Sequence, residues 1–262
     1  MNKVVLESAL SGLPVGQVHY FADIGSTNDF AFTLLENGAP DGSLVVADTQ
    51  TQGRGRLGRK WVTVAGAALA FSLALRPRGP DLDHLAFYAP LAGLAVCQAL
   101  TQDYHLPAEV KWPNDVLLDR RKTCGILVEA VWQGSQLQGV VVGIGVNVAP
   151  SAVPPDNEVL FPATCVEQAL GRPLVRMELL AAILRRFFEL RPQIGSAAFL
   201  HLWQERLAFR GEEVHVDLLG PGETVTGRVE GIDKNGNLRL RKQDGIEIIV
   251  SAGDVRLRPL QE

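Results

Sequence analysis

The sequence predicts an α+β fold, in which a mixed, largely antiparallel sheet packs against helices and is followed by a small β-barrel. Between residues 108 and 148, short apolar runs are separated by short turns, which is typical of antiparallel strands. Apolar residues recur with helical spacing in 83–102 and 177–190, and beyond these helices the spacing changes to strict alternation. The 262 residues therefore divide into a large domain, 1–208, and a small one, 209–262.

The composition indicates a globular protein without bulk affinity for nucleic acid. Apolar residues make up 47% and charged residues 21%, enough for a sizeable core. The 25 Lys and Arg against 29 Asp and Glu give a net charge of −4, so any basic site must be local. The longest apolar runs, 65–75 and 140–148, are shorter than the roughly 20 residues that span a bilayer. Without a visible secretory signal, these features predict a cytoplasmic protein with no nucleic-acid or membrane partner.

The cysteines and histidines predict no metal site. Cys97, Cys124 and Cys165 are widely spaced in apolar surroundings, which is typical of buried, reduced thiols. The five histidines show neither i, i+4 pairing nor a cysteine at the spacing of metal ligands. We therefore expect no metal held by protein ligands.

The helices of the large domain follow from apolar spacing and from capping residues. We expect them at about 27–37, 83–102, 177–190 and 197–207. Ser26, followed three residues later by Asp29, forms a capping-box pattern at the start of the first one. Pro90 implies that the second helix either begins near that residue or is kinked there.

The strands follow from short apolar runs bounded by turn residues. In the large domain we expect them at 44–47, 67–75, 109–112, 116–118, 126–132 and 139–148. In the small domain, alternation predicts strands near 214–218, 223–232, 238–242, 246–251 and 255–258. Asn235-Gly236 supplies a hairpin turn between the second and third of these, and the polar stretch 149–158 is typical of a loop.

Residues 53–61, Gly-Arg-Gly-Arg-Leu-Gly-Arg-Lys-Trp, have three interpretations as a binding segment. As a dinucleotide fingerprint, the segment lacks a convincing following helix and an acidic residue about 20 positions on. As a P-loop, it has Arg59-Lys60 in place of Lys-Ser/Thr, so no hydroxyl is present to hold Mg²⁺. The third interpretation is a flexible, strongly basic loop that suits a phosphate or carboxylate and is disordered until an anion neutralises it. A solvated basic turn is the simpler alternative.

Two further segments favour an anion-binding site. Lys111 ends a predicted strand before the turn Pro113-Asn114-Asp115, and Asn147 places an amide in an otherwise apolar strand. Each has an ordinary alternative, since Lys111 can be an exposed strand end and Asn147 a turn residue. Together with the basic loop, they predict a local site for an anionic ligand.

Five ordered motifs resemble those of the biotin–protein ligase family. They are Gly25-Ser26-Thr27-Asn28 with Gln50, the run 53–61, Lys111-Trp112-Pro113-Asn114-Asp115, Gly125-Ile126-Leu127-Val128-Glu129 and Gly143-Ile144-Gly145-Val146-Asn147. With the turn Gly-Ile-Asp-x-Asn-Gly-x-Leu at 231–238, the resemblance covers nearly the whole chain. It implies a catalytic domain similar to class II synthetases, followed by a Src-homology-3-like barrel.

The resemblance implies an ATP-dependent, two-step ligation. Biotin and ATP, with Mg²⁺ as the counter-ion of ATP, would give biotinyl-5′-AMP and pyrophosphate. The mixed anhydride would then acylate one lysine of the biotin carboxyl carrier protein domain of a carboxylase. Adenylation is chemically reasonable because a carboxylate oxygen is a poor leaving group, and because cations are needed where two anions meet.

The resemblance also assigns roles to individual residues. Those expected to bind biotin are Ser26, Thr27, Asn28, Gln50, Gly53, Arg54, Lys111 and Gly125. Those expected to bind the nucleotide are Arg56, Trp61 and Asn147. Lys111, Arg54 and Arg56 are the expected catalytic cations. Two assignments have simpler alternatives, because Ser26 can act only as a helix cap and Trp61 only as a core residue.

Several questions stay open at the level of sequence. Asp115 and Glu129 lie near the motifs, but neither is assigned as a general base. About 20 residues precede Gly25, too few for a winged helix-turn-helix, so we expect a ligase without repressor activity. Leu57 stands where some family members have another arginine, and the sequence leaves a homodimer possible. The alternatives are a lipoate–protein ligase, which Gln50 and the full basic run disfavour, and a non-catalytic biotin sensor, which the three cations disfavour.

Overall fold

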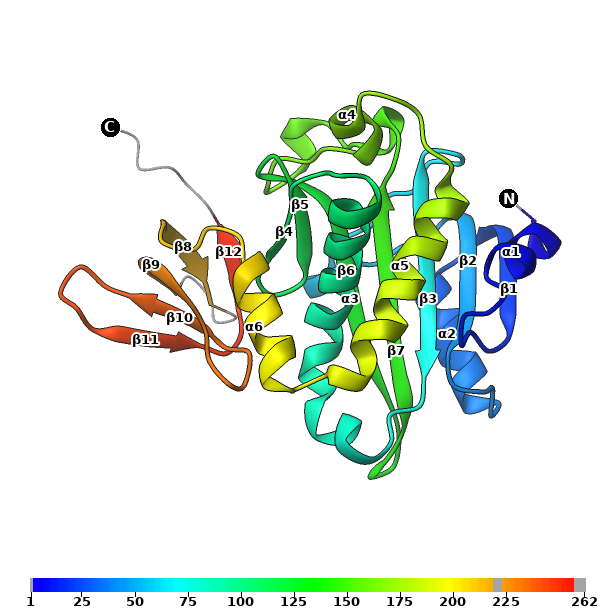
Figure 1. Ribbon diagram of the computed structural model, residues 1–262, viewed down its shortest axis with the longest axis horizontal. Coiled ribbons are helices and arrows are strands. Elements are labelled where there is room, and N and C mark those ends of the chain that lie inside the picture. Colours follow the sequence, from blue (N-terminus) through cyan, green and yellow to red (C-terminus); the bar gives the residue numbers. More distant parts are fainter. Residues whose placement is uncertain (1, 219–222, 257–262) are drawn as a thin grey trace.

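The structure is a computed structural model that describes residues 2–218 and 223–256. A large sheet with its helices forms the main body, and a second, smaller sheet packs beside it (Figure 1). The last two residues of the strand predicted at 255–258 lie outside the described residues.

The large sheet has seven strands in the order β1-β2-β3-β7-β6-β5-β4. The strands are β1 (Val18–Ile24), β2 (Ser43–Gln50), β3 (Ala68–Leu75), β4 (Ala108–Lys111), β5 (Asp115–Leu118), β6 (Arg121–Gln133) and β7 (Gln136–Asn147). Every neighbouring pair is antiparallel except β1 and β2, which are parallel. The prediction of a mixed, largely antiparallel sheet is therefore confirmed.

Helices cover both faces of this sheet. They are α1 (Lys3–Ala9), α2 (Thr27–Glu36), α3 (Tyr88–Gln98), α4 (Val166–Leu170), α5 (Arg176–Leu190) and α6 (Ala197–Arg206). Because side chains alternate along a strand, Val46 joins the core that contains α3 and α5, whereas Val45 joins a smaller cluster with Ala31 and Leu35 of α2. Figure 1 shows α3 and α5 crossing the front of the sheet. The N-terminus of α2 consequently lies on the opposite face.

The helix predicted at 83–102 begins at Tyr88, the first residue of α3. A 3₁₀ segment over Gly79–Phe87 precedes α3, so Pro90 lies in the first turn, whose N–H groups have no partner within the helix. The proline marks a helix start and no kink. Within the described residues, Asp81–Asp103 is long and apolar enough to cross a membrane, but 67% of its most apolar window is buried in the protein. That burial is typical of a core helix.

Two elements at the N-terminus, α1 and β1, have no counterpart in the sequence-based prediction. The β1 strand is an edge strand in which only Val18 is buried, so it lacks the apolar run of an inner strand. The three cysteines are free and buried, as predicted, and burial raises the pKa of the Cys97 thiol to about 12.

The C-terminal sheet has five antiparallel strands in the order β11-β10-β9-β8-β12. They are β8 (Glu213–Asp217), β9 (Thr224–Ile232), β10 (Leu238–Arg241), β11 (Glu247–Val250) and β12 (Asp254–Arg256). Among the described residues, β11 and β12 each pair with one strand only. The sheet is joined to the main body, since Trp112 Nε1 donates to Gly236 O at 3.0 Å and Ile232 N of β9 donates to Gln204 Oε1 of α6 at 3.2 Å.

Candidate active site

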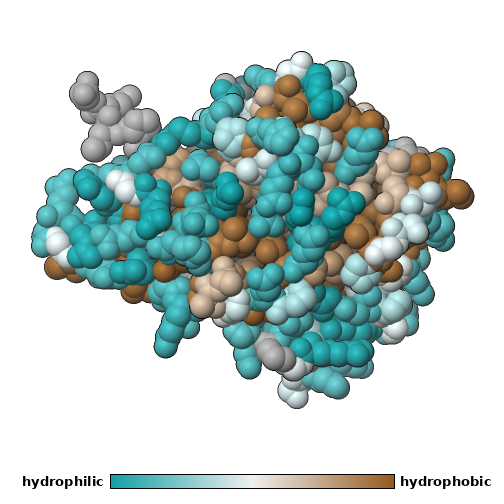
Figure 2. Space-filling view, in the orientation of Figure 1, coloured by the Kyte–Doolittle hydropathy of each residue, from teal (hydrophilic) through white to brown (hydrophobic). Residues whose placement is uncertain are grey.

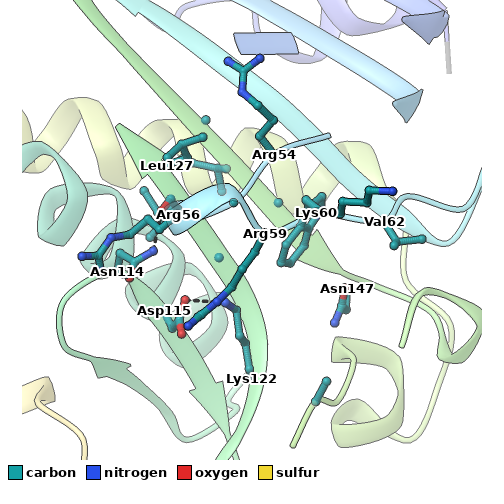
Figure 3. Close-up of a pocket in the computed structure, with 18 of the residues that line it drawn as sticks. Arg54, Arg56, Arg59, Lys60, Val62, Asn114, Asp115, Lys122, Leu127 and Asn147 are labelled. Carbon is teal, nitrogen blue, oxygen red and sulfur yellow. Dashed lines mark hydrogen bonds and ion pairs between the residues drawn. The ribbon is translucent and has the colours of Figure 1, made fainter. Parts of the chain in front are cut away.

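A cavity of about 480 Å³ opens where α2, β6 and β7 meet three loops (Figure 3). Residues from both the sheet and the loops line it. Among the residues predicted from sequence, those that line it are Ser26, Thr27, Asn28, Gln50, Arg54, Arg56, Trp61, Lys111, Gly125 and Asn147. Gly53 does not line it. A Cβ on Gly53 would lie 2.3 Å from Trp61 O, so this glycine lets the two ends of the basic loop approach each other.

Glycines form the floor of the cavity beneath an indole ring. Gly125 of β6 and Gly145 of β7 are directly paired in the sheet. A Cβ on Gly145 would come within 2.3 Å of the Trp61 ring, and one on Gly125 within 3.0 Å of it. Missing side chains therefore let Trp61 lie flat on the sheet. Its Nε1 is buried without a hydrogen-bond partner among the described residues, which is costly unless a ligand or water supplies an acceptor.

The N-terminus of α2 forms a polar end of the cavity. Ser26 caps the helix, accepting a hydrogen bond from Asp29 N at 3.4 Å. The next residue, Thr27, donates from its backbone N to Gln50 Oε1 at 2.8 Å, and its Oγ1 lies 3.0 Å from the same oxygen. All three predicted residues of this end are thus brought together, and Ser26 serves as a cap as well as a lining residue.

Ser72 of β3 completes this polar end and was not predicted. Its Oγ lies 2.7 Å from Thr27 Oγ1 and 2.6 Å from Asn28 Oδ1, with no solvent exposure. Asn28 Nδ2 donates to Glu129 Oε2, so its Oδ1 must accept from Ser72. Two hydroxyl protons then serve three oxygen contacts, counting the one between Thr27 and Gln50. The Thr27 hydroxyl oxygen keeps a lone pair that can accept an N–H from a ligand.

The basic loop 53–60 is folded back on itself. Gly55 N donates to Arg59 O at 2.7 Å, and Trp61 N donates to Gly53 O at 2.9 Å. Leu57 and Gly58 have φ values of 57° and 71°, the left-handed turn for which glycine is suited. The loop therefore forms a tight turn that lines the cavity.

The two arginines of this loop have different surroundings. Arg54 Nη1 donates to Asp29 Oδ2 at 2.8 Å, and its Nη2 also contacts Glu129 Oε1 at 3.3 Å. Arg56 Nη1 donates to Asn114 Oδ1 at 3.0 Å and to Gly253 O at 3.5 Å, which links the loop to the C-terminal sheet. In Figure 3, Arg54 points away from the other labelled cations.

A buried carboxylate joins two lysines in the wall of the cavity. Asp115 Oδ2 lies 3.2 Å from Lys111 Nζ, and its Oδ1 lies 2.6 Å from Lys122 Nζ. Burial alone would raise the pKa of Asp115, but attraction and hydrogen bonds from both lysines lower it. The Lys111 side chain is 2% exposed, whereas that of Lys122 is 26% exposed. Lys122 is not among the site residues predicted from sequence, and its place three residues before Gly125 is the signal that could have indicated it.

Asn147 lies at the end of β7, away from the polar end. It is buried, and its Nδ2 donates to Thr164 O at 3.2 Å. Asn28 packs on Gly143, four residues earlier on the same strand. At about 3.3 Å per residue, the two amides are roughly 13 Å apart along the strand. The cavity can therefore hold an elongated ligand with recognition groups at both ends.

Comparisons with known proteins agree with this arrangement. Residues 20–147 match the biotin/lipoate A/B protein ligase family, and residues 210–258 match the biotin protein ligase C terminal domain. The chain is 35% identical to the bifunctional ligase/repressor BirA of Bacillus spizizenii over 93% of this chain and 75% of that protein. It is 37% identical to the biotin–[acetyl-CoA-carboxylase] ligase of Paracoccus denitrificans over 87% and 95% of the two chains.

A solved structure shows the same likeness. The biotin protein ligase from Aquifex aeolicus in complex with biotin and ATP superimposes with a TM-score of 0.77 at 31% identity, covering 92% of this chain and 98% of that one. The sequence match and the shared architecture lead to one conclusion: the chain belongs to the biotin/lipoate A/B protein ligase family.

Proposed function

We propose that this protein is an ATP-dependent biotin–protein ligase that forms biotinyl-5′-AMP and transfers biotin to a lysine of a carrier protein domain. The observation that carries the proposal is one cavity with three chemically different parts. A neutral polar end around Thr27 and Gln50, a cationic middle around Asp115, and an aromatic and amide end at Trp61 and Asn147 line the same space. Its volume of about 480 Å³ lies within the range of ligand pockets, roughly 300 to 1,000 Å³.

The polar end suits a neutral ureido ring. A ureido group presents two N–H donors and one carbonyl acceptor. Thr27 Oγ1 has two lone pairs and one proton, so beside its contacts with Gln50 and Ser72 it can accept an N–H. A dithiolane ring offers no such donor, so the same oxygens disfavour lipoate. Asn28, which packs behind this end against Gly143, completes the proposed biotin site.

The cationic middle suits the reacting groups. In the first step, a biotin carboxylate oxygen attacks the α-phosphorus of ATP. The bond from that phosphorus to the oxygen that bridges it to the β-phosphorus breaks, which releases pyrophosphate. In the second step, the amine nitrogen of the acceptor lysine attacks the acyl carbon and loses a proton. The bond from the acyl carbon to the anhydride oxygen breaks, and AMP leaves with that oxygen. Both steps concentrate negative charge on phosphate oxygens, which fixed cations stabilise.

Arg56, Lys111 and Lys122 are the proposed cations. The exposure of Lys122 lets its ammonium reach a ligand, while Lys111 is almost fully buried beside Asp115 and lies 5.0 Å from the Phe161 ring. We assign the charge-stabilising role to Lys122 as well as to Lys111, with Asp115 positioning both. This extends the role expected for Lys111 from sequence.

The remaining end suits adenine. The Trp61 ring offers an aromatic face, and with its Nδ2 bound to Thr164 O, Asn147 keeps Oδ1 as an acceptor for an adenine amino group. The described residues contain no cluster of three acidic, cysteine or histidine side chains able to hold a metal ion. Asp115, the buried carboxylate of the cavity, is already bound by two lysines. Mg²⁺ would therefore enter with ATP, held by phosphate oxygens and water.

The proposal also covers the domain division, the acceptor protein and the compartment. We assign residues 1–208 to the catalytic domain and 209–262 to a Src-homology-3-like barrel, supported by the five antiparallel strands. The acceptor is the biotin carboxyl carrier domain of a carboxylase, and the reaction takes place in the cytoplasm. No repressor activity is part of the proposal.

Pyrophosphate release from ATP by the purified protein tests the proposal. We expect release with biotin, none with lipoate, and biotinylation when a carrier domain is added. Release with lipoate alone would move the protein to the lipoate-specific relatives. Biotin binding without pyrophosphate release would make it a sensor.

A further inference from the structure

Arg54 is held by two carboxylates that are not part of the cavity wall. Its guanidinium forms a bidentate contact with Asp29 of α2, with Nη1 to Oδ2 at 2.8 Å and Nη2 to Oδ1 at 2.7 Å. The same Nη2 contacts Glu129 Oε1 of β6 at 3.3 Å. One side chain of the basic loop is thereby tied to two separate elements of the main body.

This contact leaves Arg54 a poor candidate for stabilising a developing anion. Two carboxylates and one guanidinium give the cluster a net charge of −1. The hydrogen bond to Asp29 is the main reason why the pKa of Arg54 is raised. The side chains are 37–51% exposed, so a single pair would contribute little. A bidentate contact within a network of three charged residues is the arrangement in which surface ion pairs do fix the positions of their side chains.

Glu129 connects this cluster to the polar end of the cavity. Its Oε2 accepts from Asn28 Nδ2 at 2.7 Å while its Oε1 faces Arg54. That contact fixes which side of the Asn28 amide faces Ser72, because an amide nitrogen cannot accept the 2.6 Å hydrogen bond from Ser72 Oγ. Glu129 is therefore the carboxylate that contacts both the Asn28 amide and the arginine that ties the loop to the main body.

We propose that Glu129 is a positioning residue that sets the orientation of Asn28 and, through Arg54, holds the basic loop over the biotin end of the cavity. The inference rests on the proposed function and deepens it. Arg54 acts in it as a tether for the loop, whereas Arg56, Lys111 and Lys122 supply the charge. Glu129 touches neither the ligand nor the reacting atoms.

Glu129→Gln tests the role because glutamine keeps the size but has one oxygen. In wild type, one carboxylate oxygen accepts from Asn28 and the other from Arg54. A single amide oxygen cannot take both places, and the negative charge that attracts Arg54 is lost. We expect the KM for biotin in pyrophosphate release to rise about tenfold, since preorganised contacts are lost on the biotin side only. The KM for ATP and kcat should each change less than about threefold. A purely structural role would not separate the two substrates.

The matched control is Glu230→Gln in β9. Glu230 makes an equivalent bidentate pair, with Arg241 Nε at 2.5 Å and Nη2 at 2.7 Å, in the C-terminal sheet. Its loss should leave both KM values unchanged. A second readout needs no ligand: trypsin should cleave the 53–60 loop faster in Glu129→Gln than in wild type or Glu230→Gln, because all loop arginines are retained.

A double-mutant cycle with Arg54→Gln completes the test. If Glu129 acts through Arg54, the double variant should raise the KM for biotin less than the product of the two single effects. The inference would be overturned if the effects of the two single substitutions on the KM for biotin multiplied in full, or if the KM values for biotin and ATP rose equally. Biotin-dependent pyrophosphate release by the wild type would still uphold the proposed function. Wild-type protein without biotin-dependent pyrophosphate release would overturn the function, and the trypsin comparison would still judge whether Glu129 holds the loop.

Discussion

Asn28 lies directly on Gly143. A Cβ added to that glycine would come within 2.1 Å of Asn28 Oδ1, closer than any real contact allows. Helix α2 on one side of the sheet and strand β7 within it therefore meet through a missing side chain. This contact seats the amide that Ser72 and Glu129 orient.

Gly143→Ala should therefore impair biotin binding. The added methyl must displace Asn28, which breaks its buried hydrogen bond with Ser72 and its partly buried one with Glu129. Each buried polar group left unsatisfied costs about 1–3 kcal/mol. We expect the Kd for biotin to rise at least about tenfold and the thermal midpoint to fall by a few degrees. Isothermal titration with biotin, alongside a melting curve, measures both. Wild-type affinity in this variant would mean that Asn28 has no part in the site.

Lys122→Met and Lys111→Met separate the two lysines. Removing the partly exposed Lys122 should lower biotin-dependent pyrophosphate release about 100-fold or more, since about 3 kcal/mol of charge stabilisation is lost. The melting temperature should fall too, because the buried Asp115 loses its partner at 2.6 Å. Lys111→Met should lower pyrophosphate release by a similar factor if the role expected from sequence holds, and should also lower the melting temperature because its ammonium is buried against Asp115. Undiminished release in either variant would remove that lysine from the mechanism.

How far the sequence predicts this site depends on how each residue signals its role. Thr27 and Gln50 are predicted because their motifs resemble those of the biotin–protein ligase family, and Asn147 is predicted also because its amide stands in an otherwise apolar strand. Ser72 is missed because a single hydroxyl in the apolar strand β3 has no local signature, and only the approach of α2 gives it partners. Lys122 is missed for a different reason: three successive basic residues are typical of a solvated turn.

The fold shows the same division. Inner strands such as β3 and β7 are predicted closely because burial on both faces requires continuous apolar runs. Edge strand β1 is missed because His19 and Asp23 interrupt its apolar residues, and its parallel pairing with β2 depends on the crossover through α2. The C-terminal strands are predicted from alternation, but alternation does not encode the order in which five short strands pair.

Acid unfolding should reveal the buried Asp115. Because its pKa is lowered below the ordinary value of 3.8, its contribution to stability is fully present above that value and is lost as the pH falls through the lowered pKa. Asp115→Asn should cost about 3 kcal/mol at neutral pH, because two lysines lose their shared partner. The difference in unfolding free energy between variant and wild type should shrink below pH 3.8. Denaturant titrations at pH 7 and pH 3 measure it, and a difference that stays constant would show that the carboxylate is not charged in the folded protein.

The basic loop should respond to both substrates together. Its glycines and clustered positive charge favour mobility without an anion, and the Arg54 contacts with Asp29 and Glu129 hold only one of its charged side chains. Biotin and ATP bring carboxylate and phosphate groups that can neutralise the others. We expect trypsin to cut within 53–60 at least about tenfold more slowly with both ligands than with either alone, because cleavage follows the open population of a segment. Glu230→Gln should show the same protection as wild type. Equal cleavage rates with and without ligands would mean that the loop does not close on the reacting anions, and that the cations of the site come from Lys111 and Lys122 alone.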